Sequence, residues 1–254
     1  MTKQEALYKY SLRLGDSTLI LGHRLSEWCG HGPKLEQDIA LINIALDLLG
    51  QARSYLSYAA EIEGKGRTED DLAYHRVERD FHNLLLTERP NDNWGNTIMR
   101  SFFFDVFHYY FLSELTKSKD EQLAAIAAKS LKEVTYHVKH NSDWVIRLGD
   151  GTEKSHKIMQ DAVDELWDYT GEMFDMDEVD EILIKENIAP DLAPIKEKWL
   201  QKVKDVFREA TLEMPEVQEW HHSGGKMKGI HSEHMGYILS EMQYLPRVHP
   251  DATW

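Results

Sequence analysis

The sequence predicts an all-α protein, an antiparallel helical bundle with additional peripheral helices. Only 7 prolines and 15 glycines interrupt the 254 residues, and they gather in short clusters. The segments between the clusters are long and carry apolar residues at helical spacing, whereas alternating strand patterns are absent. Long helical segments joined by short connections are typical of antiparallel bundles.

The glycine and proline clusters set the bounds of the predicted helices, because these residues interrupt helices and favour turns. The clusters are CGHGPK (29–34), EGKGR (63–67), RPNDN (89–93), LGDG (148–151), IAPDLAP (188–194) and HSGGKMKG (222–229). The predicted helices between them are 4–28, 34–62, 69–87, 95–117, 121–148, 153–175, 191–213 and 232–246. No internal repeat or low-complexity linker divides the chain, so residues 1–254 are predicted to form a single domain.

Two of these helices are expected at the centre of the bundle. The 34–62 and 95–117 segments are apolar nearly all round, the second through SFFFDVFHYYFL at 101–112. Such helices normally have neighbours on several sides. The remaining helices are amphipathic and are expected in an outer layer.

Composition excludes several classes of protein. The net charge of −15 argues against a nucleic-acid partner and against a polybasic membrane surface. The single cysteine, Cys29, excludes an internal disulfide framework and a cysteine-cluster metal site. The N-terminal residues lack the apolar run of a signal peptide, and no stretch reaches the roughly 18 apolar residues of a membrane span. A cytoplasmic protein with no membrane partner is expected.

Charged residues inside the two central segments are the first candidates for chemistry. Asp47 lies within ALINIALDLLGQAR (40–53), with Asn43 one turn before it. A buried carboxylate without a partner is costly, so Asp47 needs one. Asp105 and His108 are three residues apart in the aromatic run and share one helix face.

This pattern matches part of the ligand set of ferritin-like di-metal bundles. Those bundles use a lone carboxylate on each of two helices and a Glu-x-x-His pair on each of two others. Asp47 and Glu133 are candidates for the lone carboxylates, and Asp105 with His108 for one pair. Glu133 falls at the edge of its apolar stripe. The 153–175 helix offers only Glu165 followed by Asp168, without a histidine, so one pair is missing.

Two interpretations of these residues stay open. The sequence favours a buried hydrogen-bonded network of Asp47, Asn43, Asp105 and His108, with Arg53 or a tyrosine as a further member. The alternative is a di-metal carboxylate oxygenase or oxidase that acts by itself, with an aspartate-rich site.

Three further segments receive structural interpretations. His231 and His234 in HSEHMG are expected as cap residues at a helix start, not as metal ligands. The glycine-rich GGKMKG (224–229) is expected to be a flexible connection. The acidic DMDEVDEILIKE (175–186) is expected to be a solvated surface, because Val179 and Asp180 stand where an EF-hand needs an oxygen ligand and glycine.

Four long stretches carry a family resemblance that covers almost the whole chain. Residues 12–53, 83–94, 123–140 and 229–250 resemble the subunit lettered C in the bacterial phenylacetyl-CoA epoxidases, also called phenylacetate-CoA oxygenases. The resemblance implies a ferritin-like bundle in a multicomponent monooxygenase of aerobic phenylacetate degradation. It implies a non-catalytic structural subunit that packs against a related catalytic subunit, lettered A in these complexes.

The resemblance also implies where the cofactor lies. The catalytic subunit would hold the di-iron centre and epoxidise phenylacetyl-CoA, a small subunit lettered B would assist assembly, and a reductase subunit would supply electrons. No catalytic residue and no cofactor are expected in this chain, and in isolation it is a possible homodimer. Asp47, Asp105, His108, Glu133, Glu165 and Asp168 would be degenerate di-metal positions. The 94–112 and 235–248 segments are the candidate partner surfaces.

Overall fold

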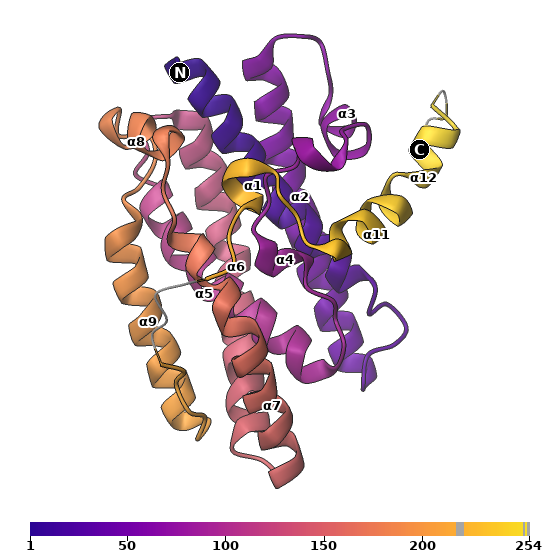
Figure 1. The fold of residues 1–254 in the computed structure, drawn as a ribbon, viewed down its shortest axis with the longest axis vertical. Coiled ribbons are helices and arrows are strands. Elements are labelled where there is room, and N and C mark those ends of the chain that lie inside the picture. The colour runs from indigo at the N-terminus through magenta and orange to yellow at the C-terminus, as the bar shows by residue number, and fades with distance from the viewer. Residues whose placement is uncertain (217–220, 251, 253–254) are drawn as a thin grey trace. The chain divides into compact units, whose positions relative to one another are not determined.

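The computed structural model describes residues 1–216, 221–250 and 252, and every regular element in those residues is helical (Figure 1). The predicted all-α class is therefore confirmed. No helix among the described residues is long and apolar enough to cross a membrane. The chain forms two compact units: unit 1 holds residues 1–89, 177–183 and 224–254, and unit 2 holds residues 90–176 and 184–223. The single-domain prediction concerns how these units combine, and it stays a prediction.

Unit 1 is built on a pair of long helices. They are α1 (Lys3–Ser26) and α2 (Leu35–Glu63), and the shorter helices around them are α3 (Glu69–Tyr74), α4 (Leu85–Glu88), α10 (Gly225–Lys228), α11 (Glu233–Met242) and α12 (Tyr244–Val248). Most of α8 (Glu178–Lys185) also belongs to this unit. A Cβ on Gly15 would lie 2.8 Å from the Leu56 side chain, so this glycine lets α1 and α2 approach closely.

Unit 2 is arranged around α5 (Trp94–Leu115). Its other helices are α6 (Glu121–Gly149), α7 (Glu153–Leu166) and α9 (Leu192–Glu209), all of which contact α5. The rings of Phe103 and Trp199 lie 5.8 Å apart, and the Trp199 indole donates to the Phe103 carbonyl at 2.9 Å. The aromatic 94–112 segment therefore belongs mainly to the core of unit 2, and α5 is central as predicted.

The 34–62 helix, predicted to be central with neighbours on several sides, has one face that is open to solvent. One apolar stripe of α2 faces outward: Leu35 is 72% exposed, Ile39 50% and Leu46 60%. Asp47 is only half-buried and Asn43 is exposed. An apolar sequence does not by itself show burial, because apolar side chains also lie on protein surfaces.

The predicted 69–87 helix is interrupted. Between α3 and α4 lie only a single 3₁₀ turn at Glu78–Asp80 and extended residues. The backbone N–H of His82 donates to the Asp16 carboxylate at 2.8 Å, and that of Leu84 donates to the Ser17 hydroxyl at 3.2 Å. These N–H groups are thus bound by side chains of α1 instead of by carbonyls of their own helix.

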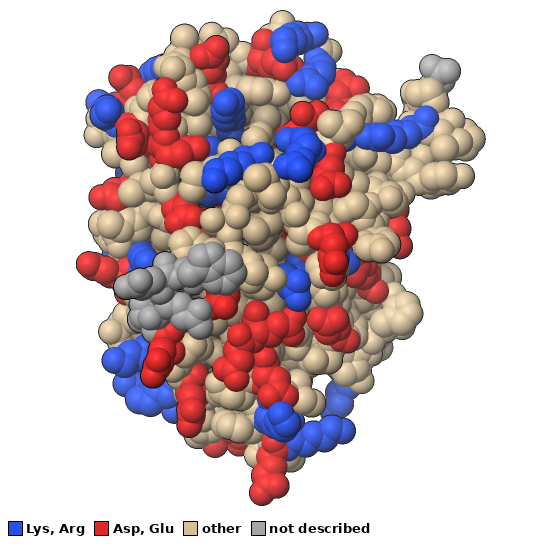
Figure 2. All heavy atoms as spheres, viewed as in Figure 1, with Lys and Arg blue, Asp and Glu red and all other residues tan. Residues whose placement is uncertain are grey.

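The predicted 153–175 helix ends early. After α7, the chain forms 3₁₀ turns at Trp167–Tyr169 and Gly171–Phe174. The Thr170 hydroxyl donates to the Trp167 carbonyl at 2.7 Å, and the His222 N–H donates to the Asp168 carbonyl at 2.9 Å. Figure 2 shows acidic side chains gathered over α7, where Asp161, Asp164 and Glu165 are exposed.

The predicted 232–246 helix is divided into α11 and α12 at Gln243. Pro246 has no N–H to donate to the Met242 carbonyl, which accounts for the break.

Residues 224–229 are not an open connection, because a Cβ on Gly225 would lie 2.4 Å from the Asn83 carbonyl oxygen. A close fit to the chain requires glycine there.

The 175–186 segment is a solvated surface only in part, since Glu178, Glu181 and Glu186 are exposed. It contains α8, whose Val179 and Leu183 are buried. Buried Asp180 accepts a hydrogen bond from the Arg13 guanidinium at 3.2 Å, and Asp177 accepts another at 3.0 Å. Two of the acidic residues, Asp177 and Asp180, therefore bind a buried arginine of α1 that lies far away in the sequence.

Candidate functional site

A buried polar cluster in unit 2 contains the predicted Asp105–His108 pair. Both residues lie on α5, and His137 and Asn141 face them from α6, all four at most 4% exposed. The Asn141 amide donates to Asp105 Oδ2 at 2.6 Å. Asp105 Oδ1 and His108 Nδ1 are enclosed without a hydrogen-bond partner among the described residues. The structure thus places Asp105 and His108 in one buried polar cluster.

Burial determines the protonation of this cluster. Burial raises the pKa of Asp105 to about 6, although the nearby His137 and the Asn141 amide both act to lower it. Burial also lowers the pKa of His108 to about 3, and His137 adds to that effect. His108 is therefore a neutral imidazole at neutral pH, whereas Asp105 becomes protonated at a higher pH than an ordinary aspartate does.

The other predicted positions do not join this cluster to make a metal centre. Glu133 is half-buried on α6, Glu165 is exposed and accepts from the Asn96 amide at 2.8 Å, and Asp168 lies beyond the end of α7. Among the described residues, no group of three or more His, Cys, Asp or Glu side chains has the arrangement of a metal site. A di-iron centre needs several carboxylate and imidazole ligands together. The residues present in this part of the chain do not fit one.

Two residues predicted as companions of Asp47 lie in exposed positions. Asn43 is exposed on α2, and Arg53 donates to the Glu69 carboxylate at 3.0 Å. Asp47 is half-buried, so the cost that demanded an enclosed partner is reduced. Asp105 carries more of this cost, because it is fully buried and its Oδ1 has no hydrogen-bond partner among the described residues.

Replacing Asp105 with asparagine should make stability less dependent on pH. The folded pKa of about 6 lies above the ordinary value of 3.8, so the Asp105 contribution is present below pH 3.8 and is lost as the pH rises through 6. When the pH rises from about 4 to about 8, the unchanged chain should lose about 2 kcal/mol more of its unfolding free energy than Asp105→Asn loses. Urea unfolding at both pH values measures this change, and an equal difference at both would contradict it.

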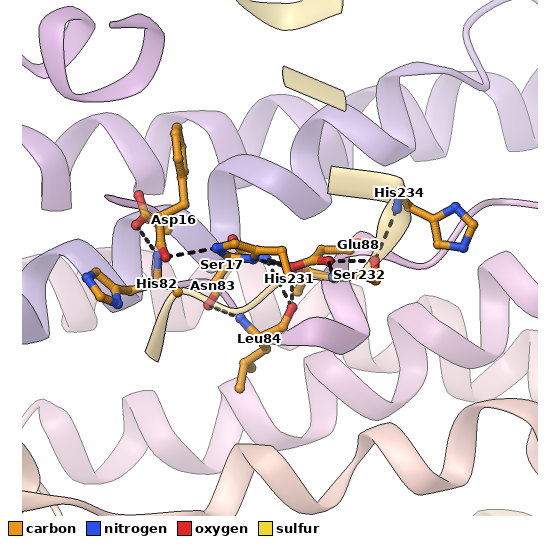
Figure 3. Close-up of polar contacts among 12 residues, drawn as sticks. Asp16, Ser17, His82, Asn83, Leu84, Glu88, His231, Ser232 and His234 are labelled. Carbon is orange, nitrogen blue, oxygen red and sulfur yellow. Dashed lines mark hydrogen bonds and ion pairs between the residues drawn. The ribbon is translucent and has the colours of Figure 1, made fainter. Parts of the chain in front are cut away.

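A second buried cluster, in unit 1, surrounds Glu88 at the end of α4 (Figure 3). Its carboxylate, fully enclosed, accepts from the Asn83 amide at 2.9 Å, from the Ser232 N–H at 2.8 Å and from the Ser232 hydroxyl at 2.6 Å. His231 Nδ1 lies 2.6 Å from the same carboxylate. Glu88 therefore binds the segment that leads into α11 to α4 and to Asn83, which precedes α4.

The surroundings of His231 favour its charged form. Its Nδ1 faces the Glu88 carboxylate, and its Nε2 lies 3.0 Å from the Phe81 carbonyl oxygen. Since both groups only accept hydrogen bonds, both ring nitrogens must donate, which requires an imidazolium. Burial alone would lower the pKa of His231, but the hydrogen bond and charge of Glu88, together with the Phe81 carbonyl, raise it. The pair is a buried ion pair whose two side chains are fully enclosed.

Stability should therefore decline as the pH rises above neutral. The folded pKa of His231 is raised, so its contribution is fully present below the ordinary value of 6.5 and is lost as the pH rises through the folded value. Urea unfolding from about pH 6.5 to about pH 9 should show a steeper loss for the unchanged chain than for His231→Gln. Parallel curves would refute this role of His231.

Asp16 of α1 holds the other end of the same region (Figure 3). The Arg76 guanidinium binds both Asp16 carboxylate oxygens, and the His82 N–H donates to one of them at 2.8 Å. Arg76 Nη1 also donates to the Asp80 carbonyl at 2.8 Å. Asp16 is fully buried and Arg76 is 5% exposed, so this ion pair fixes the irregular 75–84 chain against α1.

Comparison with known proteins identifies the family of the chain. A family model described as "Phenylacetic acid catabolic protein" matches residues 1–254. The chain is also 51% identical over 248 residues to a protein of Escherichia coli (strain K12), covering 98% of this chain and 99% of that protein. The E. coli protein is named as a subunit, the one lettered C, of 1,2-phenylacetyl-CoA epoxidase. The chain belongs to the phenylacetic acid catabolic protein family. The resemblance predicted from the sequence is confirmed.

The family has a ferritin-like helical fold, and this member is a homologue of an epoxidase subunit. The name of the E. coli relative makes that protein one subunit of a larger enzyme. Within this family member, the Asp105 cluster occupies the place where the sequence pattern anticipated a di-metal pair. Glu88 and His231 both lie in the family-like stretches 83–94 and 229–250, so those stretches contain buried polar contacts as well as apolar core. Asp16 lies in the stretch 12–53, whereas its partner Arg76 lies outside the family-like stretches.

The sequence did not single out Glu88, Asp16, His137 or Asn141 as site residues. Glu88 follows the apolar run LLL in NLLLTERP, which is the same signal that drew attention to Asp47. The histidines did not form one group, because His221 contacts Asp175 at 2.8 Å while His222 stacks on Tyr169. Ser232 is the N-cap of α11, as the interpretation of HSEHMG as a helix start requires.

Proposed function

We propose that this chain is a non-catalytic structural subunit of a multicomponent phenylacetyl-CoA epoxidase, and that it packs against and stabilises the related catalytic subunit. The ring epoxidation would be a step of aerobic phenylacetate degradation. The proposal is supported by the 51% identity to the E. coli epoxidase protein over nearly the whole chain. The main support for the non-catalytic role is the incomplete set of metal ligands around Asp105 and His108.

The chemistry of that ligand set argues against oxygen activation in this chain. A di-metal carboxylate site needs inward carboxylates on four helices, two of them paired with histidine. Here the α7 carboxylate Glu165 is exposed and bonded to Asn96, and α7 supplies no histidine three residues later. We therefore assign the di-iron centre to the catalytic subunit and no cofactor to this chain. The small subunit would assist assembly, and the reductase subunit would act on the complex only indirectly.

Co-purification with the cognate catalytic subunit tests the structural role. We expect a complex of fixed stoichiometry at micromolar concentration, with an iron content that the catalytic partner alone accounts for. The double variant Asp105→Asn with His108→Gln should leave iron content and epoxide formation unchanged per assembled complex. Separate elution of the two proteins would overturn the structural role, whereas stoichiometric iron in the isolated chain would overturn the non-catalytic role.

A further inference from the structure

Residues 233–248, which comprise α11 and α12 and are named the C-terminal arm here, have one buried and one exposed apolar face. Met235, Ile238, Leu239 and Met242 belong to the hydrophobic core cluster that includes residues of α1 and α2. The opposite face carries large apolar side chains beside the exposed Ser240 and Glu241: Tyr237 is 73% exposed, Tyr244 62% and Val248 50%. Large exposed apolar side chains gathered on one element are the usual mark of a protein–protein contact.

The C-terminal arm is fixed to the rest of unit 1. The Gln243 amide donates to the carbonyls of Ala73 at 3.3 Å and Arg76 at 3.0 Å. The Arg247 guanidinium donates to the Arg76 carbonyl at 2.9 Å, and the Glu88 cluster holds Ser232 at the base of the arm. The exposed tyrosines are thus presented on a backbone that is already ordered, which reduces the entropic cost of binding.

Grooves lie on both sides of the C-terminal arm. One, of about 490 Å³, is lined by residues that include Val77, Leu239, Tyr244 and Val248, and Val77 is itself 58% exposed. The other, of about 470 Å³, is lined by residues that include Met242 and Leu245, and Leu245 is 51% exposed. A partner that covered the arm would therefore bury apolar residues along both edges as well as along its outer face.

The charges along these grooves indicate the chemistry of the partner. Asp70 and Glu241 line one groove and Glu78 the other. Among the described residues lining the grooves, Arg247 is the one lysine or arginine, and its guanidinium is bound to main-chain carbonyls. In Figure 2 the outer part of the arm is largely uncharged. An apolar surface bordered by carboxylates fits a partner whose apolar side chains are bordered by lysine or arginine.

We propose that the C-terminal arm docks the cognate catalytic subunit through apolar side chains bordered by lysine or arginine. This inference rests on the proposed function, which makes the catalytic subunit the partner. A second copy of this chain is a poorer occupant, because it would bring another net charge of −15 and the same acidic groove borders. The arm thus becomes a specific part of the partner surface, whereas the 94–112 segment is largely core.

Binding of the purified catalytic subunit to variants of this chain tests the proposal. Tyr244→Ser combined with Val248→Ser should weaken the affinity for that partner at least tenfold. The matched control, Tyr136→Ser with Met176→Ser, removes two apolar side chains that are 49% and 44% exposed in unit 2, and it should change the affinity less than twofold. Thermal unfolding of each variant, followed by circular dichroism, checks that folding is unchanged.

A charge-reversal variant tests the second part of the proposal. Asp70→Lys with Glu241→Lys should also weaken binding, and the effect should grow when the salt concentration is lowered, since screening decreases. Unchanged affinity of the Tyr244/Val248 variant would overturn the inference while leaving the proposed function intact. Loss of a wild-type homodimer in that variant, with unchanged binding of the catalytic subunit, would assign the arm to a second copy. A wild-type chain that does not bind the catalytic subunit overturns both proposals.

Discussion

Replacing Asp16 with alanine is expected to lower the free energy of unfolding by about 3–5 kcal/mol, because it leaves the buried Arg76 guanidinium without its carboxylate. The same change removes the acceptor for the His82 N–H, whose bond to Asp16 replaces a helical bond in the 75–84 chain. The irregular chain between α3 and α4 should therefore lose its order together with the ion pair.

Urea unfolding of Asp16→Ala measures this loss. Arg53→Ala serves as the control, because it removes one partner of the Arg53–Glu69 ion pair, in which the arginine is 77% exposed. Exposed ion pairs contribute about 0–1 kcal/mol, so the control should unfold nearly as the unchanged chain does. Similar unfolding free energies for the two variants would show that the enclosed Asp16–Arg76 pair stabilises the fold no more than the exposed Arg53–Glu69 pair does.

Glu88→Ala is expected to destabilise the chain by a similar amount, about 3–5 kcal/mol, and to release the start of α11. It would leave the His231 imidazolium enclosed without a counter-charge and deprive Ser232 of the acceptor for both its N–H and its hydroxyl. The matched control is Glu233→Ala. Glu233 directly follows Ser232 in the chain, but its side chain is 85% exposed.

A second comparison separates the charge pair from simple loss of packing. Glu88→Gln with His231→Leu removes both charges, and it should cost less than the sum of the two single changes, because neither partner remains enclosed and charged. Additive costs would indicate that Glu88 and His231 act independently. Hydrogen exchange at α11 amides would report whether the arm opens before unit 1 unfolds as a whole.

The helical class and most helix bounds follow from local information. The predicted 95–117 and 121–148 helices agree closely with α5 and α6, because glycine, proline and cap residues mark their ends. The predicted 69–87 helix failed for a different reason. The Asp16 and Ser17 side chains that bind its N–H groups lie more than sixty residues earlier, as the separations of 66 and 67 residues show. No local pattern encodes such a contact.

The candidate site was predictable only in part. Asp105 and His108 were found because a carboxylate and a histidine three residues apart in an aromatic run are unusual and must share a helix face. Their partners His137 and Asn141 were not, since α6 is amphipathic and its polar residues are expected to face solvent. The sequence predicts Asp47 as an enclosed carboxylate because the residues around it are apolar. Several of those apolar residues of α2 are exposed, so the sequence overstates the burial of this helix.

The connection between Glu88 and His231 spans 143 residues, and it has a consequence for the order in which the chain is made and folded. Unit 2 is encoded almost entirely between these two residues, so during synthesis it can be complete before His231 and Ser232 exist. Until then, the Glu88 carboxylate lacks the groups that neutralise it. We expect a chain released at residue 223 to retain a protease-resistant unit 2 while residues 1–89 are cleaved. Equal resistance of both parts would show that unit 1 does not need its final segment.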